Sequence, residues 1–135
     1  MRINDKIEEI ENYLLELEEI VPGNFEEYEK DFEKKAACER YFEKIIEAIT
    51  DLAFLLIRNK KWDMPYSDTD AFQLLADKGR ISKELSEKLQ KAKSMRNFIA
   101  HEYGEVDDSI VFEAVKNELI IDVKEFIDLI RRVEF

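Results

Sequence analysis

Apolar residues recur along most of the chain at alternating spacings of three and four, the period of an amphipathic helix. In the first segment, Asp and Glu occupy most of the positions between them. Pro22 and Gly23 end this segment, because proline disfavours the helical state of the preceding residue and glycine permits a turn. Asn24 can cap the helix that follows. The predicted stripe of the first helix is Ile3, Ile7, Ile10, Leu14, Leu17 and Val21.

The second segment runs from Phe25 to about Asn59 without a Gly or Pro. Its early part is acidic, and the sequence gives no sign of a break or bend within 32–37. Its later part is apolar on several faces, which predicts a helix that is central or is also covered by a partner chain. The apolar positions are Phe42, Ile45, Ile46, Ile49, Leu52, Ala53, Leu56 and Ile57.

Turn and cap signals divide the remaining chain. Residues 60–70 read as a loop, and Ser67, Asp68 and Thr69 are candidate caps for a short helix that Gly79 ends. Ser82 starts a longer helix that stops at Gly104. The apolar stripe of this helix is Leu85, Leu89, Ala92, Met95 and Ile99. Asp107 and Asp108 are then predicted to cap a final long helix. The apolar stripe of the final helix is Val111 or Phe112, Val115, Leu119, Val123, Phe126, Ile130 and Val133.

The pattern therefore predicts an all-α fold of five or six helices, three or four of them long. Short connections make neighbouring long helices antiparallel, which gives an up-and-down helical bundle. Three Gly and two Pro are too few for a β-sandwich with many tight turns. A length of 135 residues suits a single domain spanning 1–135.

Charge changes this picture in one region. The chain has 21 Lys and Arg against 32 Asp and Glu, a net charge of −11, which excludes a generic DNA-coating protein. The stretch from Lys78 to Arg96 is nevertheless basic, with seven cations and two acids. It could steer a phosphate-bearing ligand, or it could meet the acidic Asp5–Glu33 region of a second copy. The charged start and the lack of a long apolar run predict a cytoplasmic protein that does not span a membrane.

Candidate chemistry is confined to the sequence MRNFIAHEYG, which holds the only histidine, His101. On a regular helix Arg96 and His101 lie about 140° apart, whereas Arg96 and Tyr103 share a face and Asn97 stacks on His101. One site containing all four requires either a helix that frays near His101 or groups from a second chain. Histidine titrates near neutral pH, and arginine can grip two phosphate oxygens. A histidine that only complements a helix dipole is the simpler alternative.

Two other residues have structural interpretations. Cys38 is alone, which excludes an internal disulfide and a cysteine-rich zinc site, and it reads as a small core residue. Trp62 could contact RNA or a partner, although anchoring of its loop is the favoured reading. No spacing of carboxylates and histidine predicts a metal centre.

The segment RNFIAHEY resembles the Arg-x4-His-x-Tyr signature of the HEPN superfamily, in its HepT-like branch. The flanking helices IEEIENYLLEL and CERYFEKIIEAITDLAFLLI, the connector PYSDTDAFQLLADKGRIS and the final helix resemble that family in order, so the similarity covers nearly the whole chain. The resemblance implies a HEPN-like four-helix core with extra short helices, and a homodimer in which two motif-bearing helices line a shared cleft.

The resemblance also implies a function: the toxin of a toxin–antitoxin pair, a metal-independent endoribonuclease that needs no cofactor and cuts RNA through 2′-OH attack. Arg96 and His101 would be catalytic, and Asn97 and Tyr103 would position the substrate. Tyr103 would also be adenylylated by a partner minimal nucleotidyltransferase, the antitoxin, which would block the cleft. The alternative is a non-catalytic HEPN module that binds a nucleotide or a nucleotidyltransferase.

Overall fold

The structure is a computed structural model that describes residues 2–101 and 107–134. Every element in these residues is helical, as the apolar pattern predicts. In chain order they are α1 (Arg2–Ile20), α2 (Phe25–Lys30), α3 (Phe32–Asn59), α4 (Asp68–Asp77), α5 (Lys83–His101), α6 (Asp108–Glu113), the π-helical segment η1 (Ala114–Leu119) and α7 (Ile120–Glu134).

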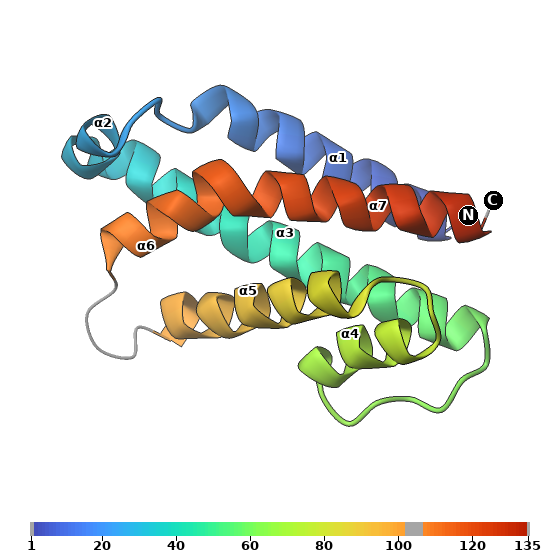
Figure 1. The fold of residues 1–135 in the computed structure, drawn as a ribbon. Helices are drawn as coiled ribbons and strands as arrows, with labels where there is room; N and C mark the ends of the chain where they lie inside the picture. Colours follow the sequence, from blue (N-terminus) through green and yellow to red (C-terminus); the bar gives the residue numbers. More distant parts are fainter. Residues whose placement is uncertain (1, 102–106, 135) are drawn as a thin grey trace.

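The four long segments form the predicted up-and-down bundle (Figure 1). α1, α3, α5 and the contiguous α6–η1–α7 helix run in alternating directions, so that α1 begins at the same end of the bundle at which α7 ends. The Arg131 guanidinium joins α7 to α1 through two hydrogen bonds of 2.8 Å to the Glu11 carboxylate. The short helix α4 packs beside α5, and α2 lies at the opposite end.

Helix α3 is the centre of the core. All eight apolar positions named in its predicted stripe are buried, and the α1 stripe is buried at its four middle positions. The break that the sequence does not reveal falls at Asp31. Its side chain accepts a 3.1 Å hydrogen bond from the Lys34 amide and caps α3, while its own amide donates to the backbone carbonyl of Glu27 and ends α2.

Most predicted helix caps are confirmed. The side chains of Asn24, Ser67, Ser82 and Asp107 each accept a hydrogen bond from a backbone amide two or three residues further on. Asp108 is not a cap. It is the first residue of α6, and its carboxylate forms a 2.9 Å ion pair with Lys35 of α3. Gly79 follows α4 with a φ of 74°, a conformation that glycine adopts without strain.

The last helix departs from the regular helix that its pattern predicts. Ala114–Leu119 form a π-helical turn between α6 and α7. The buried positions Val111, Val115, Leu119 and Val123 are four residues apart, and each such step would drift about 40° around a regular α-helix. The wider π turn takes up an extra residue and keeps all four on the core face. Within the described residues, no helix combines the length and the apolar character needed to cross a bilayer.

Candidate functional site

Helix α5 carries the motif. Ser82 caps its start, and Leu85, Leu89 and Ile99 bury its inner face in the core. The helix continues without a break to His101, so it does not fray ahead of the histidine. The five-residue separation therefore keeps the positions of Arg96 and His101 about 140° apart around the helix axis.

Arg96 is the best-defined member of the predicted site. Its side chain is only 18% exposed and forms an ion pair through Nη2 with the Glu47 carboxylate on α3. Nη1 donates a 3.3 Å hydrogen bond to Oδ1 of Asn97. Nε is buried, and no partner for it occurs among the described residues. The guanidinium is thus attached to a neighbouring helix as well as to its own.

Of the four predicted site residues, the structure describes the side chains of Arg96 and Asn97, and it brings these two into contact. Asn97 is exposed apart from its contact with Arg96. His101 is the last residue of α5, but its side chain lies outside the described part of the chain. Tyr103, and Gly104 as the predicted end of the helix, also lie outside the described residues.

Sequence reasoning missed Glu47 as a partner of Arg96. It lies about three turns before the end of α3, among acidic residues that look like the solvated side of a helix. Its side chain is 48% exposed. Because nothing in the pattern says which turn of α3 meets Arg96, only the packing of α3 against α5 could identify the pair.

Three cations of the basic stretch, Lys88, Lys93 and Arg96, form ion pairs with acids of the described residues. Lys93 is nearly buried and lies 3.0 Å from the Asp68 carboxylate on α4. Lys88 lies 3.4 Å from Glu84 and 4.0 Å from Asp122. A hydrogen bond to Glu84 raises the pKa of Lys88, while burial raises the pKa of the Asp122 carboxyl. The stretch therefore presents fewer free cations than its composition suggests.

Two more cations of the basic stretch contact the ring of Trp62. Lys78 and Arg80 lie over its ring, with Nζ and Cζ at 5.3 and 5.5 Å from the centroid. Trp62 also packs against the core, which agrees with its interpretation as an anchor for its loop. Cys38 is buried, as predicted, and burial raises the pKa of its thiol to about 11. It is a core residue.

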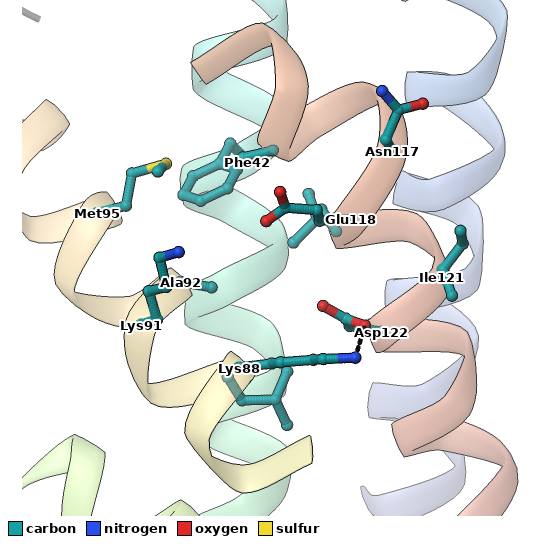
Figure 2. Close-up of a pocket in the computed structure, with 12 residues that line it drawn as sticks. Phe42, Lys88, Lys91, Ala92, Met95, Asn117, Glu118, Ile121 and Asp122 are labelled. Atoms are coloured by element: carbon teal, nitrogen blue, oxygen red, sulfur yellow. Dashed lines mark ion pairs between the residues drawn. The ribbon is translucent and has the colours of Figure 1, made fainter. Parts of the chain in front are cut away.

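A groove of about 390 Å³ follows the other side of α5 (Figure 2). Phe42 of α3 forms its floor, with Lys91 and Met95 on one wall and Glu118 and Ile121 on the other. Met95 lines this groove, whereas Arg96, the next residue, contacts α3. The groove and the motif cation therefore belong to different faces of α5.

Comparisons with known proteins agree with this architecture. The profile of a family described as Ribonuclease HepT-like matches residues 10–130. The mRNA nuclease HepT of Shewanella oneidensis is 30% identical over 129 residues, which are 96% of each chain. The tRNA nuclease HepT of Aphanizomenon flos-aquae is 26% identical over 113 residues, which cover 84% of this chain and 77% of that protein.

A solved structure shows the same fold. The tri-AMPylated HEPN toxin of Shewanella oneidensis, in complex with MNT antitoxin, superimposes with a TM-score of 0.89 at 28% sequence identity. The match covers 96% of each chain. The helical bundle described above is therefore similar, over nearly its whole length, to the fold of that HEPN toxin.

Proposed function

Because this chain belongs to the HepT-like ribonuclease family, we propose that it is the toxin of a toxin–antitoxin system and an endoribonuclease that cuts RNA without a metal ion. The observation that carries the proposal is the Arg-x4-His-x-Tyr spacing at the end of α5, where Arg96 is held by Glu47 and Asn97 while part of its side chain stays open to solvent. The nuclease names of the two curated relatives support it.

In the proposed reaction, the ribose 2′-oxygen forms a bond to the adjacent phosphorus and the bond from phosphorus to the 5′-oxygen breaks. One group takes the 2′-OH proton and another gives a proton to the departing 5′-oxygen, and His101 serves as one of the two. Arg96 stabilises the charge that develops on the phosphate oxygens, which is often the largest catalytic contribution. Asn97 orients Arg96 and the phosphate.

The active form is proposed to be a homodimer. Since α5 is regular up to His101, Arg96 and His101 of one chain are on different sides of the helix. A two-fold arrangement of two α5 ends would let Arg96 of one subunit and His101 of the other approach the same phosphate. Residues 1–135 would act as a single HEPN-like domain in each subunit.

The proposed inhibitor is a minimal nucleotidyltransferase antitoxin. It would transfer AMP from ATP to the Tyr103 hydroxyl and release pyrophosphate. The added phosphate would place negative charge beside Arg96 and obstruct RNA. The support is the solved complex of an AMPylated HEPN toxin with MNT antitoxin.

The test is cleavage of tRNA and mRNA by the purified protein in the presence of EDTA. Wild type is expected to yield fragments with cyclic-phosphate ends, and Arg96→Ala and His101→Ala are each expected to lose at least about 100-fold in rate. Lys83→Ala is the matched control, because Lys83 is an exposed cation in the first turn of the same helix.

Retained activity in both variants would contradict the assignment of Arg96 and His101. A wild-type protein that binds a nucleotidyltransferase but cuts neither RNA at any concentration would favour the non-catalytic HEPN module instead. Activity that appears only with an added divalent ion would contradict metal independence.

A further inference from the structure

Glu47 is the one residue from another helix that contacts the Arg96 guanidinium through an ion pair in the described part of the chain. It lies on α3, the central helix, which buries 11 of its 28 residues in the core. The pair therefore connects a partly exposed cation to the central helix of the bundle. The predicted site, as drawn from the sequence motif, contains no such residue.

The contacts of the Arg96 guanidinium decide which of its N–H donors can still bind a phosphate. A guanidinium has five N–H donors, one on Nε and two on each terminal nitrogen. Nε is buried in the protein. Nη1 donates one hydrogen to Asn97, and Nη2 is ion-paired with the Glu47 carboxylate. The terminal N–H groups that do not face Asn97 or Glu47 are the donors with which a guanidinium binds phosphate oxygens.

We propose that Glu47 is a positioning residue that fixes the orientation of the Arg96 guanidinium so that its remaining terminal N–H groups face the scissile phosphate. The inference rests on the proposed ribonuclease function. Glu47 acts through Arg96 and does not touch the RNA. An arginine side chain that is free to rotate loses conformational entropy when it binds a phosphate, and prior attachment to Glu47 removes part of that cost.

A positioning role has a kinetic signature, because the Glu47 carboxylate also carries a negative charge. Removing it takes a repulsive charge away from the phosphate and frees Arg96 to find other orientations. Substrate binding should then be unchanged or tighter while the chemical step slows. A residue needed only for folding would lower the amount of active protein and leave both constants of the folded fraction unchanged.

The experiment compares Glu47→Ala, Glu47→Gln and Asp51→Ala in single-turnover and steady-state cleavage of a defined RNA. For Glu47→Ala we expect kcat to fall roughly 10- to 100-fold with KM unchanged or lower. Glu47→Gln keeps an oxygen that accepts from Nη2, so it should recover most of the lost rate. Asp51→Ala is the matched control, since Asp51 is an exposed acid one turn further along α3 that forms a 3.6 Å ion pair with Lys6 of α1; it should behave as wild type.

A second measurement tests the contact without activity. The Arg96 Nε–H signal in a ¹⁵N NMR spectrum, assigned by its loss in Arg96→Lys, should move or broaden in Glu47→Ala and persist in Glu47→Gln. The thermal midpoints of all variants should agree within a few degrees, because Glu47 is half exposed.

The outcomes separate the two proposals. Wild-type kcat in Glu47→Ala, or a higher kcat, would overturn the role of Glu47 as long as Arg96→Ala is inactive. An equal loss of kcat in Asp51→Ala would show that the effect follows from removing any acid on α3, and it would also overturn the role of Glu47. Full cleavage by Arg96→Ala would instead refute the ribonuclease mechanism itself.

Discussion

The Lys93 ammonium lies 3.0 Å from Oδ2 of Asp68, and the Lys93 side chain is only 7% exposed. Asp68 is the first residue of α4, and Lys93 is one turn before Asn97 on α5. The pair therefore holds the short helix against the turn that leads into the motif. It also explains why one of the most promising cations of the basic stretch is not available to a ligand.

Removing Asp68 should lower the free energy of unfolding more than replacing the buried Lys93 with an uncharged residue. Asp68→Ala leaves Lys93 without its partner in a nearly buried position, and we expect the free energy of unfolding to fall by roughly 1–3 kcal/mol, toward the lower end because Asp68 is half exposed. Lys93→Met fills similar space without a charge and should be close to neutral. Urea denaturation measures both.

Asp70→Ala is the control for the loss of an acid from the first turn of α4, since Asp70 is exposed. It should change stability by no more than about 0.5 kcal/mol. If Asp68→Ala is as mild as Asp70→Ala, the ion pair contributes nothing to the attachment of α4.

The proposed active site shared between two subunits predicts complementation between two inactive variants. When Arg96→Ala and His101→Ala subunits are mixed and allowed to exchange, half of the dimers contain one of each. Each mixed dimer has one site with both groups intact and one with neither, so the mixture should recover about a quarter of the wild-type rate. RNA cleavage before and after exchange is the measurement.

Particle mass provides the control for this experiment. Light scattering at micromolar concentration should give twice the 16.1 kDa of the chain. A mixture that stays inactive while mass spectrometry detects mixed dimers would show that Arg96 and His101 of the same chain form the site.

The π turn predicts unequal tolerance to deletions in the last helix. A π turn contains one more residue than an α turn, so deleting the exposed Asn117 should let the helix close as a regular α-helix with both halves in register. We expect a cooperative melt with a loss of no more than about 2 kcal/mol. Circular dichroism follows the transition.

Deleting the exposed Glu125 from the regular α7 is the contrast. It rotates every later residue by about 100° and turns the buried Phe126, Ile127 and Ile130 away from the core. This variant should not fold cooperatively. Equal melts for the two deletions would mean that the π turn does not absorb an extra residue.

Burial of Cys38 predicts loss of stability in alkaline solution. Its thiol has a pKa of about 11 in the folded chain, and an unfolded chain ionises near pH 8.5. The stabilising difference is therefore complete below about pH 8.5 and is lost as the pH rises toward 11. Between pH 7.5 and 10, wild type should lose roughly 1–2 kcal/mol more than Cys38→Ala. Parallel losses in both proteins would contradict a protonated buried thiol.

The helical pattern correctly predicts the features that depend on a single helix, namely its buried face and its start. Stripes such as Ile7 to Leu17 predict the buried face, and Asn24 and Ser82 predict helix starts, because both depend on interactions within a few residues. The break at Asp31 is also local, yet it was missed. An aspartate among many acids gives no distinctive signal that it will cap a helix.

The same distinction between features of one helix and features of helix packing applies to the candidate site. The sequence by itself determined that Arg96, Asn97 and His101 share one helix, and helical geometry determined that Arg96 and His101 occupy different sides of it. The roles of His101 and Tyr103, and the extent of one domain over 1–135, remain predictions. Only the tertiary structure decided that Arg96 is attached to Glu47, that Lys93 is held by Asp68, and that the last helix widens at Ala114–Leu119. The physical reason is that these features depend on which turns of separate helices meet in the packed core, and local periodicity does not encode that register.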